Sequence, residues 1–452
     1  MDDFLNSQCT VTVDGREVVV NAGLTILTAL KHIGIPVPSL CHDQRLERAN
    51  GNCGMCVVEV DSERREVKAC VTPVLPGMEI HTHSASVDAY RRLRVGQLLC
   101  DHNADCEPPC QQRCPAHIDI QRYLALVTDG NFEAAVRVIK DRNPFPSVCG
   151  RVCPHPCEGE CRRNLVDEPV GINNVKRFAA DWDLSREQPW IPTVGEATGK
   201  RLAVVGAGPS GLTAAFYAAL AGHEVTVFER QPLPGGMLRY GIPEYRLPKA
   251  TLDAEIGIIE SMGVRIMCSK SLGTHLRLED LQRDFDAVYL SIGSWTPTPL
   301  HLEGENAEGV LTGIRYLEHV VKGTDPEPGD TVVVVGGGNT AIDCARTALR
   351  RGAGQVILLY RRTRDEMPAE PHEVADAAAE GVQLRFLAVP SAIVAEPEGG
   401  VKLRCLRMEL GEPDRSGRRR PIPIEGSDFE LSASLVIGAV GQSTNAQFLY
   451  ND

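Results

Sequence analysis

The sequence is poor in aromatic residues and contains no long hydrophobic run. Phenylalanine, tyrosine and tryptophan make up 5% of its 452 residues. No run approaches the roughly eighteen apolar residues of a membrane-spanning helix. Residues 1–8 are acidic and polar and lack the apolar stretch of a secretory signal. We therefore expect a cytoplasmic protein without a membrane span.

Positive charge is also scarce. The chain has 47 lysines and arginines against 60 aspartates and glutamates, so its formal net charge is −13. Nucleic-acid binding requires a basic face and is not expected, and the basic run at residues 415–420 is predicted to be a hairpin loop. The motif H-E-x-x-H, the nucleophile elbow and the Walker loop are missing. We therefore expect no catalytic residues of the protein itself, and chemistry carried by cofactors.

Cysteine, in contrast, is abundant. Without a secretory signal, sixteen cysteines indicate metal ligands or redox groups rather than disulfides. Half of them are Cys100, Cys106, Cys110, Cys114, Cys149, Cys153, Cys157 and Cys161. Eight thiolates match the ligand count of two 4Fe–4S clusters. Four others fit no ligand spacing, and Cys344 among them is predicted to be a packed core thiol.

Residues 1–84 predict a small β-grasp domain holding one 2Fe–2S cluster. A hairpin is expected to turn at Asp14-Gly15, and a helix over residues 25–33 is expected to follow. The ligands expected here are Cys41, Cys53, Cys56 and Cys70. Gly51 and Gly54 suit a loop that wraps the cluster closely. A zinc site with four thiolates is the alternative. The cysteine spacing resembles the N-terminal ferredoxin domain of the complex I large iron–sulfur subunit and of related NAD-linked hydrogenases and formate dehydrogenases.

Residues 85–185 predict an α-helical domain with two 4Fe–4S clusters. Helical patterns cover residues 85–99, 120–130 and 132–142. The phrases CPAHIDI, GRVCPHPCEGEC and EPVGINNVKRF resemble the iron–sulfur domain of the small subunit of bacterial NADPH-dependent glutamate synthase. The resemblance implies interleaved ligands. One cluster would take Cys106, Cys110 and Cys161, and the other Cys114, Cys153 and Cys157.

Two ligands are left open by this resemblance. The first cluster needs Cys100 or His102 to complete it. In the second cluster, Lys176 stands where the family has a Glu or Gln ligand, and a protonated lysine cannot coordinate iron. Cys149 is the nearby replacement. A zinc site or a partly vestigial set of ligands is the alternative.

After a linker at residues 186–199, residues 200–325 predict a first Rossmann-like domain. A strand, a G-x-G-x-x-G turn, a helix and a second strand ending in an acid follow one another. The expected nucleotide-binding residues are Gly206, Gly208, Pro209, Ser210, Gly211, Glu229 and Arg230. These residues alone allow FAD or NAD. Residues 234–248 resemble the flavin-contacting loop of the glutamate synthase small subunit, which implies FAD. This loop would contribute Gly236, Met237, Leu238, Gly241, Ile242 and Arg246.

Residues 326–434 predict a second Rossmann-like domain, with the expected site residues Gly336, Gly338, Asn339, Thr340 and Ala341. Tyr360 stands in place of the strand-end acid, and Arg361 and Arg362 follow it. Two guanidinium groups favour a 2′-phosphate and hence NADP(H) over NAD(H), although a solvated surface pair is the alternative. Residues 435–452 resemble the return to the FAD domain, which stops short of a family G-D motif. We therefore expect a truncated chain, or FAD binding that is completed elsewhere.

Together these patterns predict a multidomain α/β protein. The expected function is that of an NAD(P)H-dependent iron–sulfur flavoprotein that moves electrons between NADPH, FAD, the 4Fe–4S and 2Fe–2S clusters and a partner catalytic subunit. The chain shows no site for another substrate, so we expect a hetero-oligomer with a subunit of hydrogenase, formate dehydrogenase or glutamate synthase type. The alternative is a flavin-deficient scaffold that only holds clusters or conducts electrons.

Overall fold

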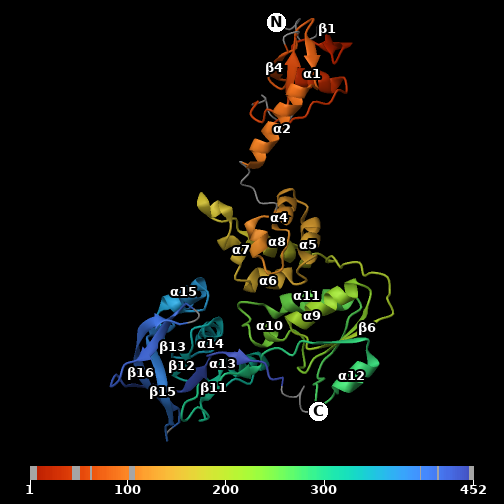
Figure 1. Cartoon of the computed structure of the whole chain (residues 1–452). Coiled ribbons are helices and arrows are strands. Elements are labelled where there is room, and N and C mark those ends of the chain that lie inside the picture. Colours follow the sequence, from red (N-terminus) through yellow and green to blue (C-terminus); the bar gives the residue numbers. More distant parts are fainter. Residues whose placement is uncertain are drawn as a thin grey trace. The chain divides into compact units, whose positions relative to one another are not determined.

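The computed structural model of the chain describes residues 8–42, 51–61, 64–100, 107–397, 399–414 and 417–446. It divides into two compact units, Met1–Cys106 and Glu107–Asp452 (Figure 1). Each unit is described by itself. No helix among the described residues is long and apolar enough to cross a membrane.

The first unit is a five-stranded sheet with one short helix. Its strands lie in the order β2-β1-β5-β3-β4. Their bounds are β1 Gln8–Val13, β2 Arg16–Asn21, β3 Val57–Val60, β4 Arg65–Lys68 and β5 Glu79–His81, and the helix is α1 Ile26–His32. The predicted hairpin is confirmed, because β1 and β2 pair in register and Asp14 and Gly15 both have positive φ. Thr25 caps α1 by accepting a hydrogen bond from the Thr28 amide.

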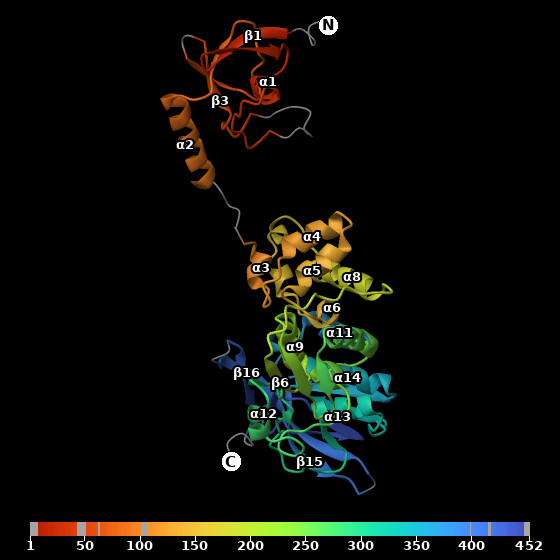
Figure 2. The ribbon, with the colours of Figure 1, turned by 90° about the vertical axis from the view of Figure 1, so that its right-hand side faces the viewer.

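Helix α2 (Ala85–Cys100) belongs to this first unit (Figure 2). The guanidinium of Arg91 is buried and donates to the Met55 carbonyl at 3.1 Å and to the Val57 carbonyl at 2.8 Å. The sequence placed this helix in the following iron–sulfur domain. The difference arises because Arg91 satisfies backbone carbonyls of the cysteine loop, which a pattern of apolar residues does not reveal.

The second unit begins with a helical segment. It contains α3 Pro109–Arg113, α4 Ile120–Thr128, α5 Phe132–Lys140, α6 Pro146–Val152, α7 Pro156–Gly159 and α8 Ile172–Leu184. The predicted helices at α4 and α5 are confirmed, and Asp119 and Asn131 cap their N-termini. Helices α6 and α8 cross at Gly150. A Cβ added there would lie 2.6 Å from the Cβ of Arg177, so only glycine allows this approach.

The first Rossmann-like fold has a parallel sheet in the order β8-β7-β6-β9. Its elements are β6 Arg201–Val205, α9 Pro209–Leu220, β7 Glu224–Phe228, α10 Met237–Tyr240, α11 Lys249–Ser261, β8 Arg265–Met267, α12 Leu278–Asp284 and β9 Ala287–Leu290. Helices α9 and α11 pack on Val204 and Val227, whereas α12 packs on Ala203 and Val205. The two faces of the sheet are therefore both covered, as expected for parallel strands.

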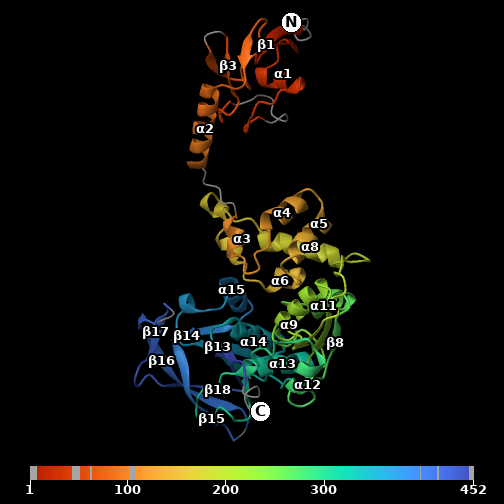
Figure 3. The same ribbon diagram turned by 45° about the vertical axis from the view of Figure 1, so that its right-hand side comes forward.

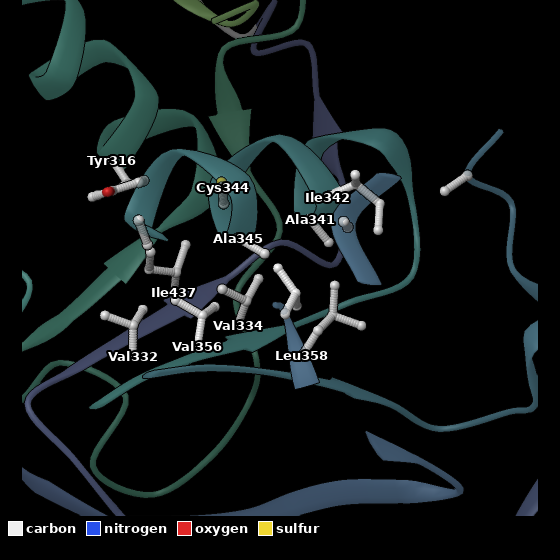
Figure 4. Packing of buried hydrophobic residues seen from close by; sticks show 14 of the residues in the cluster. Tyr316, Val332, Val334, Ala341, Ile342, Cys344, Ala345, Val356, Leu358 and Ile437 are labelled. Atoms are coloured by element: carbon white, nitrogen blue, oxygen red, sulfur yellow. The ribbon is translucent and has the colours of Figure 1, made fainter. Parts of the chain in front are cut away.

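The second Rossmann-like fold has a parallel sheet in the order β11-β19-β12-β13-β14. Its elements are β11 Val310–Thr312, α13 Gly313–Lys322, β12 Thr331–Val335, α14 Asn339–Arg350, β13 Gln355–Tyr360, α15 Pro371–Ala379, β14 Gln383–Phe386 and β19 Leu435–Gly438. Its core includes Cys344, which is buried between α14 and the sheet as predicted (Figure 4).

An antiparallel sheet, which the sequence did not predict as a unit, covers the other face of this fold (Figure 3). It consists of β15 Ala388–Ala395, β16 Val401–Pro413, β17 Arg419–Pro423 and β18 Phe429–Ala433. Strands β16 and β17 form the hairpin expected around the basic run, of which Arg415 and Ser416 lie outside the described residues.

Two strands lie elsewhere than the sequence suggested. Strand β11 was expected in the first fold and β19 in the return segment, but both pair inside the second sheet. β19 is buried throughout, as a central parallel strand requires. The return to the first fold starts later, where β20 (Gln442–Ser443) pairs with β10 (Thr296–Pro297).

Candidate functional site

The glycine-rich turn after β6 is shaped by its first and last glycines. Gly206 has a φ of +107°, and a Cβ added there would lie 2.3 Å from the Ser291 carbonyl oxygen. A Cβ on Gly211 would lie 1.9 Å from the Gly206 oxygen, so Gly211 lets α9 pack on the strand. Helix α9 begins at Pro209, and its first-turn N–H groups are free to hold a phosphate.

This turn opens on a cavity of about 900 Å³. Eight of the residues expected to bind the first nucleotide line it: Gly206, Gly208, Pro209, Ser210, Glu229, Arg230, Gly236 and Met237. Residues not expected there include Gln231, Lys270, Ser271, Trp295, Arg315, Glu318 and Asn445. The Arg230 guanidinium lies 4.4 Å from the Trp295 ring centroid, which builds a flat cationic wall. Ser291, just after β9, also lines the cavity, and no spacing signal in the sequence pointed to the lining residues of α13.

Glu229 stands at the end of β7, where the sequence placed a ribose-binding acid. Its carboxylate is 5% exposed and accepts hydrogen bonds from the amides of Ala207 at 2.7 Å and Gln231 at 2.8 Å. The two bonds fix the carboxylate at the cavity wall. Each oxygen keeps a lone pair with which it can accept a hydroxyl.

The predicted flavin loop is only partly at the cavity. Gly236 has a φ of +52°, and a Cβ added there would lie 2.7 Å from the Gly208 Cα, so the loop closes over the glycine-rich turn. Leu238 packs in the core below, and Ile242 packs against it. Gly241 and Arg246 are not among the residues that line the cavity. The structure therefore brings two of the six loop residues to the site.

The second nucleotide turn repeats the geometry of the first. Gly336 has a φ of +149°, and Gly338 is the N-cap of α14. Gly337 lies so close to the ring of Tyr360 that a Cβ would be 2.3 Å from it. Asn339 is already engaged, because its Oδ1 accepts from the Glu370 amide at 3.0 Å. Thr340 and the buried Ala341 follow in the first turn of the helix.

The two arginines after β13 have different surroundings. Arg361 is exposed. Arg362 is 4% exposed and donates to the Asp414 carboxylate at 2.6 Å and to the Arg419 carbonyl at 2.7 Å. The two arginines therefore differ: Arg361 is exposed, whereas hydrogen bonds to the β16–β17 hairpin hold Arg362, and the paired grip on a phosphate stays a prediction.

The four cysteines predicted to hold the 2Fe–2S cluster, Cys41, Cys53, Cys56 and Cys70, are close enough to influence one another electrostatically. Cys53, Cys56 and Cys70 are buried, and the Cys53 sulfur accepts from the Met55 amide at 3.5 Å. Burial raises the pKa of Cys53, but hydrogen bonds from the backbone of Met55, Leu40 and Cys41 outweigh it and leave a pKa of about 7. Burial, a hydrogen bond with Cys56 and repulsion from the other thiols raise the pKa of Cys70 to about 12. These mutual effects fit one shared cluster.

Gly51 and Gly54 have positive φ, which suits the tight loop that was expected here. The contacts that the structure shows at these two glycines are with protein side chains. A Cβ on Gly51 would meet Val71, and a Cβ on Gly54 would meet Arg94. Glycine is therefore required by the backbone conformation and by these side chains.

The cysteines of the second unit interleave. Burial raises the pKa of Cys110, and its thiol neighbours are Cys161 and Cys114. Burial also raises the pKa of Cys157 to about 11, and its thiol neighbours are Cys114 and Cys153. The Cys153 sulfur accepts from the His155 amide at 3.3 Å. Cys106 and His102 lie outside the described residues, and Cys100 ends α2 in the other unit.

Cys149 has different hydrogen-bond and packing partners from this group, although Cys153 is also one of its neighbours. Its thiol donates to Asn143 Oδ1 at 3.6 Å, and it packs against the core of the first Rossmann-like fold. Burial raises its pKa to about 11, although Lys176 lowers it. Lys176 is itself buried, and its charge also acts on Cys157. Within the described ranges, no three His, Cys, Asp or Glu side chains are arranged to hold a single metal ion.

Family models match nearly the whole chain. A 2Fe-2S iron-sulfur cluster binding domain matches residues 6–85, and dihydropyrimidine dehydrogenase domain II, with a 4Fe-4S cluster, matches residues 84–188. The pyridine nucleotide-disulphide oxidoreductase model matches residues 200–452. The family models place the first boundary before α2, as in the sequence interpretation, whereas the compact units divide after α2.

Curated relatives agree with these matches. The chain is 44% identical to NADP(+)-dependent formate dehydrogenase subunit beta of Moorella thermoacetica and 46% identical to NADPH-Fe(3+) oxidoreductase subunit beta of Geobacter sulfurreducens. Each match covers 75% of this chain and 52% of the relative, so the chain spans about half the length of these two proteins. It is 36% identical to the small chain of the NADPH glutamate synthase of Escherichia coli, covering 78% of this chain and 79% of the relative. The chain therefore belongs to the pyridine nucleotide-disulphide oxidoreductase family, together with the glutamate synthase small chain, and carries 2Fe–2S and 4Fe–4S domains before its nucleotide-binding folds.

Proposed function

We propose that this chain is an NADPH-dependent electron-transfer subunit with FAD, two 4Fe–4S clusters and one 2Fe–2S cluster. When bound, the nicotinamide and flavin exchange hydride and the clusters carry single electrons. The observation that carries the proposal is the packing of the cysteine-bearing helices on the first nucleotide fold. Phe145 and Val148, at the start of α6, belong to the same core as Val204 and Leu212 of that fold.

A buried carboxylate strengthens this packing. Glu255 on α11 accepts from the Ser147 amide at 2.7 Å and from the Val148 amide at 3.0 Å. It therefore caps the N-terminus of α6 from across the domain boundary. The cysteine segments and the flavin fold are held together by apolar packing and by hydrogen bonds. An electron relay requires short distances between its redox groups.

The protein's own residues would bind and orient the FAD. The N–H groups at the start of α9 would hold the pyrophosphate, and Glu229 would accept ribose hydroxyls. Arg230 and Trp295 present a flat cationic surface at the same cavity. The start of α14 would hold the pyrophosphate of NADPH, and Arg361 is the exposed guanidinium for its 2′-phosphate.

The proposed cluster ligands are those of the sequence interpretation, with the fourth ligand of each 4Fe–4S cluster, for which Cys100 or His102 and Cys149 were named, left open. Cys41, Cys53, Cys56 and Cys70 would hold the 2Fe–2S cluster. In the second unit, Cys114, Cys153 and Cys157 would share one 4Fe–4S cluster, while Cys110 and Cys161 would share the other with Cys106. The thiol neighbours of Cys157, which are Cys114 and Cys153, support this division, whereas Cys110 has one neighbour from each set, Cys161 and Cys114. The predicted domain boundaries are kept as well, apart from α2, β11 and β19.

The electron acceptor or donor is proposed to be a separate catalytic subunit in the cytoplasm. The relatives are named as subunits of a formate dehydrogenase, an iron(III) oxidoreductase and a glutamate synthase. The named complexes differ, so their partner subunits differ as well. We propose that the part these relatives share with this chain is the NADPH and iron–sulfur module. We therefore propose a hetero-oligomer. Co-purification of the native complex would identify the class of the partner subunit.

A matched pair of glycine variants tests the proposal. Gly211→Ala places a methyl group against the Gly206 carbonyl and is expected to abolish FAD retention and NADPH-driven dye reduction. Gly257→Ala is the control, because nothing lies within 4 Å of a Cβ at that helical position. Anaerobically reconstituted wild-type protein is expected to contain flavin and about ten iron atoms per chain. Wild-type protein that retains no flavin and reduces no dye would refute the proposal.

A further inference from the structure

Two residues of the flavin loop dock into the second nucleotide fold. Arg246 Nη1 lies 2.7 Å from Asp343 Oδ2 on α14, and Arg246 Nε lies 2.9 Å from Glu373 Oε1 on α15. Tyr245, its neighbour, is covered by two guanidinium groups of α14. The Arg346 and Arg350 guanidiniums lie 4.9 Å and 4.2 Å from the Tyr245 ring centroid.

These contacts are buried. Side-chain exposure is 13% for Arg246, 5% for Asp343 and 10% for Glu373. Burial raises the pKa of Asp343 to about 6, although Arg246 opposes the rise. A buried ion pair with one partner removed leaves an uncompensated charge, which is strongly unfavourable. Arg246 therefore supplies a compensating charge for Asp343, and it shares Glu373 with Arg346, whose Nη1 lies 2.6 Å from Glu373 Oε2.

Their position along the chain links two cofactor sites. Asp343 is four residues after Asn339, one helical turn from the second glycine-rich loop. Arg246 follows Met237, which lines the flavin cavity, within one short turn-rich segment. A movement of one site relative to the other has to break or strain the Arg246 contacts.

We propose that Arg246, with Asp343 and Glu373, is a positioning group that sets the NADPH-binding fold against the FAD-binding fold for hydride transfer. The proposal rests on the proposed function. It replaces the expected role of Arg246 as a flavin contact. Arg246 touches no reacting atom and acts through the two folds that it joins.

The effect on rate follows from the geometry of hydride transfer. The reaction requires near-contact between the hydride-donating and hydride-accepting atoms, and a misplacement of about 1 Å can cost about a hundredfold in rate. Arg246→Met keeps an apolar side chain of similar length and removes the guanidinium group. It is expected to slow the limiting rate of flavin reduction by about tenfold to a hundredfold. The affinity for NADPH and the flavin content are expected to stay as in wild type. Arg246→Lys keeps the charge and is expected to recover part of the rate.

The experiment is anaerobic stopped-flow reduction of the FAD-loaded chain over a range of NADPH concentrations, which separates affinity from limiting rate. Arg351→Met is the control, because Arg351 pairs with Asp325 at 2.8 Å inside the second fold alone. It is expected to leave the limiting rate unchanged. Hydrogen exchange of the cofactor-free protein gives a second readout. Arg246→Met is expected to speed exchange in α15 and in residues 241–247, whereas Arg351→Met leaves both unchanged.

The outcomes separate the two proposals. A wild-type chain that NADPH does not reduce refutes the proposed function. In that case, hydrogen exchange of wild type and Arg246→Met still shows whether Arg246 holds the two folds together. A normal limiting rate in Arg246→Met overturns the positioning role. Loss of flavin in that variant, or loss of NADPH affinity alone, assigns Arg246 to cofactor binding and also overturns it. If Arg246→Met does not fold, Asp343→Asn carries the same test, because it removes the carboxylate that accepts the Arg246 hydrogen bond.

Discussion

At the scale of single residues, Cys149 and Cys157 have similar raised pKa values but different neighbours. The Cys149 thiol donates to Asn143 and packs on the flavin fold, whereas Cys157 lies among Cys114 and Cys153. We predict that Cys149→Ser keeps the full iron content, because this thiol donates to Asn143 and packs against the core of the first Rossmann-like fold. Cys157→Ser is expected to lose the iron of one 4Fe–4S cluster, about four atoms per chain. Iron and acid-labile sulfide analysis measures both, and iron loss in Cys149→Ser would make it the eighth ligand.

The two arginines after β13 make a second residue-scale prediction. Charge-assisted hydrogen bonds contribute about 1.5–3 kcal/mol, so Arg361→Ala is expected to lower the preference for NADPH over NADH by about tenfold to a hundredfold. Arg362→Ala removes contacts to Asp414 and the Arg419 carbonyl. Its expected effect is on stability, with the cofactor preference kept. The measurement is the ratio of kcat/KM for NADPH to that for NADH, from steady-state kinetics of each variant. A larger loss of preference in Arg362→Ala than in Arg361→Ala would contradict this assignment.

At the scale of elements, α2 holds the loop of the 2Fe–2S site through Arg91. Arg91→Met removes two hydrogen bonds to buried carbonyls and is expected to cost about 1–3 kcal/mol of unfolding free energy. Urea unfolding followed by the visible circular dichroism of the cluster measures this loss. The control is Arg92→Met, since Arg92 is the exposed neighbour on the same helix. Equal effects of the two substitutions would show that α2 does not support the loop.

The cap on α6 makes a pH-dependent prediction. Burial raises the pKa of Glu255 to about 7, although the Ser147 and Val148 amides oppose the rise. The folded protein therefore binds a proton that the unfolded chain releases near its ordinary pKa of about 4.3. Stability should fall as the pH rises from about 4.5 through 7, because the unfolded state then binds fewer protons. Glu255→Gln is expected to flatten this part of the curve, measured by thermal unfolding between pH 5 and 8. An unchanged slope would rule out Glu255 as its source.

Local patterns in the sequence were enough to predict the N-terminal hairpin, the helices between residues 120 and 142 and the two strand–turn–helix units. The Asp14-Gly15 turn, the caps of α4 and α5, and the strand–turn–helix order at Gly206 and Gly336 are decided by residues close together in the chain. The contacts of Arg91, Arg246 and Arg362 could not be predicted from the sequence, because their partners lie far away along the chain. These same contacts account for the placement of α2 and for the surroundings of two predicted binding residues. The positions of β11 and β19 depend likewise on pairing with distant strands.

At the scale of the whole molecule, the second unit brings cysteine-bearing helices and two nucleotide folds into one compact body. Residues of α6 share a core with the first nucleotide fold, and Arg246 joins that fold to the second. The unit therefore has the contacts that a chain of electron carriers needs, from the NADPH-binding fold to the cysteines. The first unit carries its own cysteine site and a helix that is fixed to it.

The central claim is that NADPH reduces the flavin and that the electrons then reach the clusters of the same chain. An anaerobic NADPH titration of the reconstituted chain, followed by optical and electron paramagnetic resonance spectroscopy, tests it most directly. We predict bleaching of the flavin and the appearance of reduced 2Fe–2S and 4Fe–4S signals. A chain whose clusters are reduced by dithionite but not by NADPH would contradict the account and would identify a scaffold that only holds clusters.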